Sequence, residues 1–233
     1  MRAVAVIPAR GGSKRIPRKN IVDLAGRPMI GYSIDAALES GLFARVVVST
    51  DDEEVASIAR DLGAEVPGLR PRSLADDQTP VSAATSFAVR ELDGSGSTYD
   101  LVCQLMANCP LRTAADIRAS YDAFLASGAP AQISVTAFRL QSPWWAARLD
   151  DENRLEPLFP DAAASRSQDL PALVCPTGAV WWSRADVLLD EGTFHVEGRT
   201  GWEMPWINAI DIDEPDELEL ARALMSARLA GDV

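Results

Sequence analysis

Residues 3–20 read Ala3-Val4-Ala5-Val6-Ile7-Pro8-Ala9-Arg10-Gly11-Gly12-Ser13-Lys14-Arg15-Ile16-Pro17-Arg18-Lys19-Asn20. The first five of these residues are all apolar and predict a buried parallel strand. The remainder predicts a loop at the carboxyl end of that strand, which is where open α/β sheets bind their ligands. This stretch therefore indicates an α/β fold with its functional site just after the first strand.

The loop is strongly basic, and it contains both lysines of the chain, Lys14 and Lys19, although arginine supplies every other basic side chain. Compact ammonium groups on flexible stems suit phosphate oxygens. Gly11 and Gly12 allow the backbone to approach an anion closely and to direct N–H groups at it. We therefore predict a phosphate-binding loop. The alternative is a solvated basic turn, since runs of like charge are usually solvated.

Strand and helix signals alternate along the chain, which favours a mostly parallel sheet with flanking helices in a single α/β domain over residues 1–233. We expect further strands at 45–50, 64–66, 99–106, 132–138, 178–183 and 206–212. We expect helices at 28–40, 52–63, 79–92, 113–127 and 214–229, and a flexible connection at 94–97. Five prolines lie in residues 141–176, which we expect to form an excursion over the substrate cleft, a dimer contact, or both.

Composition argues against several classes of protein. The net charge of −12 argues against general nucleic-acid binding, which needs a broad cationic surface. The chain has no apolar stretch of membrane-spanning length, and Met1 and Arg2 lead into a strand rather than a signal peptide, so we expect a cytoplasmic protein with no membrane partner. The three cysteines lack Cys-x-x-Cys spacing, which favours free thiols over a disulfide framework or a zinc site. The one histidine, His195, has no nucleophile motif beside it.

The basic loop has neither the P-loop spacing nor the Gly-x-Gly-x-x-Gly spacing of dinucleotide folds. It resembles instead the signature of sugar nucleotidyltransferases, specifically the acylneuraminate (CMP-sialic acid) cytidylyltransferase family, and Arg10, Lys14 and Lys19 fall on that signature. The resemblance continues in order through Val47–Asp52, Leu69–Pro71, Cys109–Thr113, Arg166–Pro171, Gly178–Val180 and Ile210–Asp213.

This resemblance implies a Rossmann-like nucleotidyltransferase that transfers CMP from CTP to the anomeric hydroxyl of a nonulosonic acid of the sialic, legionaminic or pseudaminic type, releasing pyrophosphate. The implied partners are CTP, an acidic nine-carbon sugar and a second copy of the chain in a homodimer. The implied nucleotide-binding residues are Arg10, Gly11, Gly12, Ser13, Lys14, Lys19, Arg70 and Asn108. Arg10, Lys14 and Asp211 are the implied catalytic residues, and Arg166 with Gln168 is implied to bind the sugar.

Asp211 and Asp213 are separated by one residue in a segment that we expect to be a strand, so both carboxylates can face one side and share a divalent cation. Magnesium fits that donor pair best. For Asp213 the alternative is a cap on the following helix, because aspartate is a common N-cap residue. The resemblance favours magnesium, because the family uses equivalent aspartates for it.

The chain departs from the family pattern at Met106–Cys109, where sialate enzymes typically have a glutamine and hydroxyl-bearing residues, and Asn108 compensates only in part. Thr177 also stands where asparagine is common. These departures favour a modified nonulosonic acid. The tryptophan pairs at 144–145 and 181–182 pack either against such a sugar or in the core or a dimer contact. Two alternatives stay open: a CMP-3-deoxy-octulosonate synthetase and a noncatalytic nucleotide-binding regulatory module.

Overall fold

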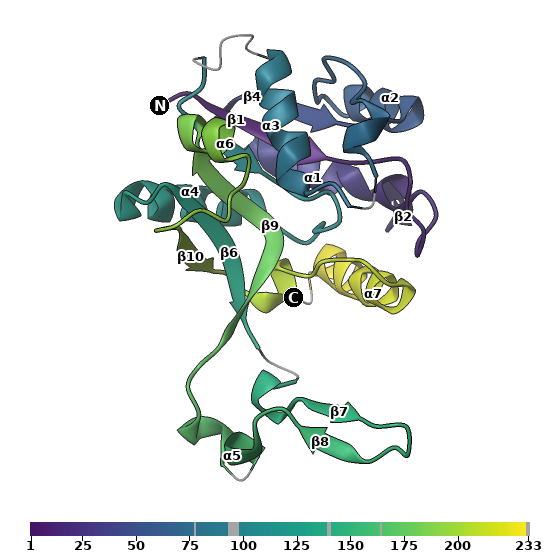
Figure 1. The fold of residues 1–233 in the computed structure, drawn as a ribbon. Coiled ribbons are helices and arrows are strands. Elements are labelled where there is room, and N and C mark those ends of the chain that lie inside the picture. The colour runs from purple at the N-terminus through teal and green to yellow at the C-terminus, as the bar shows by residue number, and fades with distance from the viewer. Residues whose placement is uncertain (77, 93–97, 139–140, 164, 232–233) are drawn as a thin grey trace.

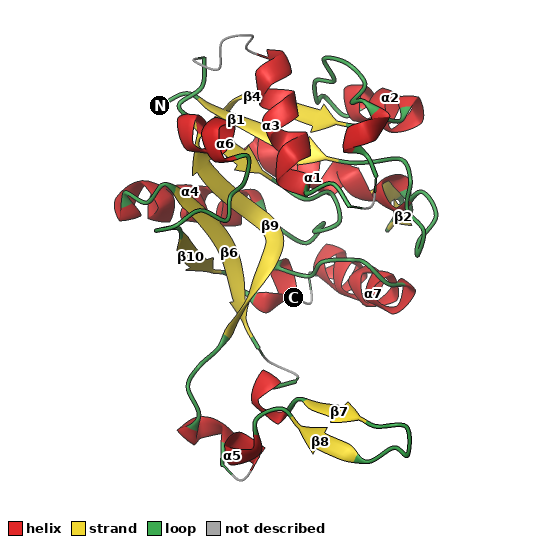
Figure 2. Ribbon diagram, viewed as in Figure 1, coloured by secondary structure: helices red, strands yellow, loops and turns green. Residues whose placement is uncertain are grey.

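A six-stranded sheet forms the centre of the protein, and helices cover both of its faces (Figures 1 and 2). The computed structural model describes residues 1–76, 78–92, 98–138, 141–163 and 165–231. In spatial order the strands are β10 (Thr200–Glu203), β6 (Ala131–Ala137), β9 (Val174–Arg184), β5 (Leu101–Gln104), β1 (Ala3–Pro8) and β4 (Phe43–Ser49). Among these described strands, only β9 runs antiparallel to its neighbours. The predicted mostly parallel sheet is therefore confirmed.

The helices of the described residues include the five that the sequence predicts and two, at residues 160–163 and 185–191, that it does not. They are α1 (Met29–Ser40), α2 (Glu53–Asp61), α3 (Val81–Leu92), α4 (Ala114–Ser127), α5 (Pro160–Ala163), α6 (Ala185–Glu191) and α7 (Pro215–Ala230). Two small hairpins complete the regular structure, β2 (Asp23–Leu24) with β3 (Arg27–Pro28) and β7 (Ala147–Leu149) with β8 (Leu155–Pro157). None of the helices in the described part of the chain has the length and apolarity needed to cross a bilayer.

Strand β1 is continuously apolar because the sheet is covered on both sides. Ala5 and Ile7 belong to the core cluster that contains residues of α1 and α4. Val4 and Val6 belong to a second cluster, with residues of α3 and α6. Successive side chains of a strand point to opposite faces, so each face requires apolar residues at alternate positions. The buried central strand expected from residues 3–7 follows directly from this arrangement.

Local sequence signals set the helix boundaries near the site. The Asp52 side chain accepts a hydrogen bond from Val55 N at 3.0 Å and caps α2. Thr113 and Asp116 form a capping box at the start of α4. Gly41 ends α1 in the left-handed conformation, with a φ of 68°, that glycine adopts most easily.

Two expected strands are wrong, and one strand of the central sheet was missed, as were the four short strands of the two hairpins. Residues 206–212 contain a 3₁₀ turn at Trp206–Asn208 and then an irregular segment, and residues 64–66 make only one isolated bridge, from Glu65 to Val47. Pro205 precedes the 3₁₀ turn and has no N–H to donate to a ladder, so the chain turns there instead of extending. The missed strand is β10, which pairs with β6 at the edge of the sheet. The connection expected at 94–97 lies outside the described residues.

Residues 141–173 leave the main body of the molecule and carry β7, β8 and α5; we call them the arm (Figure 1). The arm emerges where β6 and β9 extend past the rest of the sheet, and Ala137 pairs there with Val174. Strand β9 therefore begins inside the excursion expected at 141–176. Large apolar side chains stay exposed on the arm, including Trp145 at 51%, Leu149 at 65% and Leu155 at 71%.

Candidate functional site

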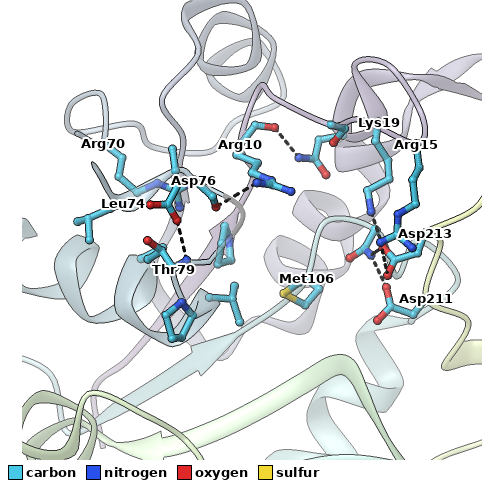
Figure 3. Close-up of a pocket in the computed structure, with 18 residues that line it drawn as sticks. Arg10, Arg15, Lys19, Arg70, Leu74, Asp76, Thr79, Met106, Asp211 and Asp213 are labelled. Carbon is cyan, nitrogen blue, oxygen red and sulfur yellow. Dashed lines mark hydrogen bonds and ion pairs between the residues drawn. The ribbon is translucent and has the colours of Figure 1, made fainter. Parts of the chain in front are cut away.

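A pocket of about 270 Å³ lies beyond the carboxyl end of β1, bordered by the basic loop, residues 70–84, residues 106–108 and the segment before α7 (Figure 3). Its size is close to the lower end of the usual range for small-molecule sites, roughly 300–1,000 Å³. The pocket brings together these predicted site residues: Arg10, Ser13, Lys19, Arg70, Asn108, Asp211 and Asp213. Sequence positions about 200 residues apart thus meet at one site.

The basic loop is held from within and from strand β4. Asn20 donates its side-chain amide to Arg10 O at 2.9 Å, which closes the loop on itself. Gly11 N donates to Asp51 Oδ1 at 3.0 Å, so this N–H is bound to a carboxylate rather than directed at an anion as we expected. Gly11, Gly12 and Lys14 do not line the pocket, and Lys14 is exposed. The close approach of Gly11 is to Asp52, because a Cβ on Gly11 would lie 2.6 Å from the Cβ of Asp52.

The acidic segment 211–213 is irregular, and the reason for its geometry differs from the strand alternation that we expected. Ile212 is fully buried in a cluster with residues of α7, which leaves its two neighbours on the pocket side. Ile212 N donates to Asn108 O at 2.9 Å, and the Asn108 amide donates to Asp211 and, at 3.3 Å, to Asp213. Both carboxylates therefore do line one pocket, although no strand carries them.

Cations from the loop reach this acidic segment (Figure 3). Lys19 Nζ donates to Asp213 Oδ1 at 2.6 Å and to Ile212 O at 2.9 Å. Arg15 pairs with Asp213 at 3.3 Å and with Glu214 at 2.6 Å. Arg15, which the family resemblance does not imply as a site residue, therefore lines the pocket. Arg18 instead lies outside it and pairs with Asp52 and Glu54.

The two predicted metal-binding carboxylates have opposite electrostatic environments. Burial, and then the negative charge of Asp213, raises the pKa of Asp211 to about 6. Burial also acts to raise the pKa of Asp213, but hydrogen bonding and charge from Lys19, with the charge of Arg15, outweigh it, so this pKa lies below its ordinary value. Positive charge therefore outweighs burial at Asp213, whereas at Asp211 the charge of Lys19 does not.

Arg70 is buried beside the pocket, and its backbone N donates to Thr50 O at 2.7 Å. Burial lowers the pKa of its guanidinium, opposed by the charge of Asp51. Its Nε has no hydrogen-bond partner among the described residues. A buried donor without a partner is costly, so a ligand oxygen that reached it would be bound favourably.

The side of the pocket that lies opposite the acidic segment was not predicted from the sequence. Arg10 Nη1 donates to Asp76 O at 3.0 Å, and Asp76 Oδ1 accepts from Thr79 N at 2.6 Å (Figure 3). This fixes the turn that leads into α3, where Leu74, Pro80, Val81 and Ala84 line an apolar part of the pocket. Thr79 and Pro80 were recognised as a helix start, but their position at the pocket depends on tertiary structure.

The two predicted sugar-binding residues lie away from the pocket. Arg166 and Gln168 are exposed on the arm, and neither lines the pocket. Of the tryptophans, Trp182 is fully buried and stacks between Phe43 and Phe124 in the core. Trp144 packs on Phe159 within the arm. These two indoles have packing roles in the described structure.

A parallel α/β sheet with a cationic loop and paired carboxylates at its carboxyl edge is the arrangement of a nucleotidyltransferase, in which charge stabilisation and positioning perform phosphoryl chemistry. A protein-family model described as Cytidylyltransferase matches residues 4–145, which is more than half of the chain. The chain therefore belongs to the cytidylyltransferase family.

Individual relatives resemble the chain over nearly its whole length. Pseudaminic acid cytidylyltransferase from Campylobacter jejuni is 36% identical over 226 residues, covering 96% of each chain. CMP-N,N'-diacetyllegionaminic acid synthase from Legionella pneumophila is 32% identical over 228 residues, covering 97% of each. A solved structure of CMP:2-keto-3-deoxy-manno-octonic acid synthetase complexed with CTP superposes with a TM-score of 0.72 at 20% identity, covering 98% of this chain and 100% of that one. The last likeness confirms the nucleotidyltransferase fold.

Proposed function

We propose that the protein transfers CMP from CTP to the anomeric hydroxyl of a nonulosonic acid and releases pyrophosphate. One observation carries the proposal: the loop cations Arg10, Arg15 and Lys19 meet Asp211 and Asp213 at one pocket, in a chain 36% identical to a pseudaminic acid cytidylyltransferase. The reaction needs no nucleophile on the enzyme, because the sugar hydroxyl attacks the α-phosphorus directly.

Arg10, Lys19 and Arg15 would bind the triphosphate and neutralise the charge that develops on the leaving pyrophosphate. Ser13 would add a hydroxyl donor, and the exposed Lys14 would approach from the rim of the pocket. Arg70 would donate from its buried Nε to the nucleotide, while the apolar wall from Leu74 to Ala84 offers a surface for a flat base. Asp211 would help to remove the proton of the attacking hydroxyl, since its carboxylate lines the same pocket as the cations that would bind the triphosphate.

Magnesium is the cofactor that we propose, held by Asp211 and Asp213. The donor set fits, because magnesium is usually bound by one or two carboxylates together with substrate phosphates and water. Within the described ranges, no group of three or more His, Cys, Asp or Glu side chains is arranged so that it could hold a metal ion, so phosphate oxygens would complete the ligand shell. When bound, the ion supplies positive charge to phosphate oxygens. Asn108 would orient Asp211 through the hydrogen bond that it already donates.

We also propose a homodimer in which the arm of one copy lies against its partner. Six large apolar side chains stay exposed on the described part of the arm, and exposed apolar surface of this kind marks interaction sites. They are Trp145, Leu149, Leu155, Leu158, Phe159 and Leu173. If Arg166 and Gln168 bind the sugar, they must do so at the pocket of the partner, because they do not line that of their own chain. Cytoplasmic location stays a prediction.

The test measures pyrophosphate release from each of CTP, ATP, GTP and UTP, with pseudaminic, legionaminic, N-acetylneuraminic and 3-deoxy-octulosonic acids as acceptors. We expect magnesium-dependent release with CTP and a nine-carbon acid. Preferential use of the eight-carbon acid would favour the octulosonate alternative. CTP binding without release from any acceptor would favour the noncatalytic module.

A further inference from the structure

Two carboxylates at the end of β4 hold both ends of the basic loop without lining the pocket themselves. Near the start of the loop, Asp51 Oδ1 accepts from Gly11 N at 3.0 Å. Near its end, Asp52 accepts two hydrogen bonds from the Arg18 guanidinium, at 2.5 Å to Oδ2 and 3.0 Å to Oδ1. Two-pronged arginine–carboxylate pairs of this kind combine strength with a fixed geometry.

Arg18 needs this support because its backbone is strained. Its φ of 57° lies in the left-handed region, which residues with side chains rarely adopt. Such conformations persist where surrounding structure enforces them, and they gather at functional sites. The ion pair with Asp52, and a second contact with Glu54, hold the Arg18 side chain in place.

The backbone conformation of Arg18 sets the position of the pocket residues that follow it. Arg18 O accepts from Ile21 N at 2.9 Å, which forms the 3₁₀ turn Lys19–Ile21. From this turn Lys19 reaches Asp213 and Asn20 reaches Arg10 O. The position of two pocket residues therefore depends on the conformation of Arg18.

We propose that the Asp52–Arg18 ion pair, which we call the loop latch, is a positioning device that holds the basic loop in its binding conformation. The role is additional to the capping of α2 by Asp52, and its effect on CTP rests on the proposed function of the pocket. Gly11 permits the latch, because any Cβ there would collide with the Asp52 side chain.

Variants can separate the latch from the helix cap. Asp52→Ser keeps a good N-cap and removes the ion pair, while Arg18→Gln removes the same ion pair and leaves the cap untouched. Glu54→Gln is the matched control, because Glu54 contacts the same guanidinium but its side chain is 66% exposed. Arg18→Lys restores the charge without the two-pronged geometry.

If the loop keeps its binding conformation about one-tenth of the time without the latch, the apparent Kd for CTP rises about tenfold. We expect that rise, by calorimetry, in Asp52→Ser and in Arg18→Gln, with no further rise in the double variant. At saturating CTP, kcat should stay near that of the parent, and the effect should appear as a higher KM for CTP. Arg18→Lys should recover part of the affinity, and Glu54→Gln should retain nearly all of it.

Hydrogen exchange of amides 11–20 tests the latch even if CTP is not the ligand. Exchange should accelerate there in both latch variants and not in Glu54→Gln. Unchanged exchange in Arg18→Gln would overturn the proposal. A loss of CTP affinity that occurs only in Asp52→Ser, together with a lower melting temperature, would also overturn it, because loss of the helix cap alone would explain that result. Failure of the parent protein to bind CTP would count against the proposed function, and the exchange result would still decide the latch.

Discussion

Asp211→Asn should make the protein more stable while it abolishes the proposed reaction. The pKa of this carboxyl rises from 3.8 to about 6 on folding, chiefly because burial disfavours its charge. Above its folded pKa the group is ionised in both states, and the folded state bears the cost of holding that charge. A neutral amide of the same shape removes this cost, and it can still hydrogen-bond to Asn108.

The size of the effect follows from the pKa difference. A rise from 3.8 to about 6 corresponds to about 3 kcal/mol at neutral pH. Asp211 is only partly buried, so solvent screens part of its charge, and we expect about half of that value, about 1.5 kcal/mol. The folded state binds the proton more tightly than the unfolded state. The contribution of Asp211 to the stability of the parent protein should therefore fall as the pH rises from about 4 to about 6.

Urea unfolding of both proteins in a chelator, from acidic to neutral pH, measures this difference. The stabilisation should be present near neutrality and should vanish below about pH 4, where Asp211 is protonated in both states. Asp213→Asn is the matched comparison and should destabilise the protein, because the charge of Asp213 is paired with Lys19 and Arg15. A lower stability of metal-free Asp211→Asn at neutral pH would refute this reasoning.

Lys19→Met should reduce turnover severely, because it removes a charge-assisted contact worth about 1.5–3 kcal/mol; steady-state kinetics with CTP would measure this, and unchanged kcat/KM would contradict the assignment. Arg166→Ala should weaken use of the sugar and leave the Kd for CTP in calorimetry unchanged, whereas selective loss of CTP binding would assign Arg166 to the nucleotide site. Mixing Arg166→Ala with Lys19→Met should restore activity if the arm serves the pocket of its partner, and no restoration would argue that each chain works alone. Leu155→Asp should lower the molecular mass measured by light scattering, while Leu220→Asp, at an exposed position on α7 (43%), serves as its control.

The sequence predicts well those features that depend on local pattern or on position within a strand. The continuous apolar run in residues 3–7 predicts a strand buried on both faces, and the caps at Asp52 and Thr113 mark helix starts that the structure contains. The convergence of Arg10, Arg70 and Asp211 was predicted from the family resemblance of ordered motifs, although no strand carries Asp211.

Features that depend on residues distant in the chain could not be predicted from the sequence. Strand β10 is short and contains a glycine, Gly201, so its own sequence does not favour a strand. It forms a strand because it pairs with the edge of β6. The contact of Arg15 with Glu214 joins residues 199 positions apart, and no local signal distinguishes it from a solvated arginine. The roles assigned to the site residues stay predictions.

The pairing of Ala137 with Val174 has a consequence for how such a chain can be altered. The arm is, in topological terms, an insertion between two strands of one β-hairpin, because β6 and β9 are already in register at its base. A two-residue Asn-Gly turn satisfies the geometry of such a hairpin. We therefore expect the arm to be a separable module. Arms of other length and sequence should replace it without changes to the sheet. Its removal should leave a monomer that keeps the pocket.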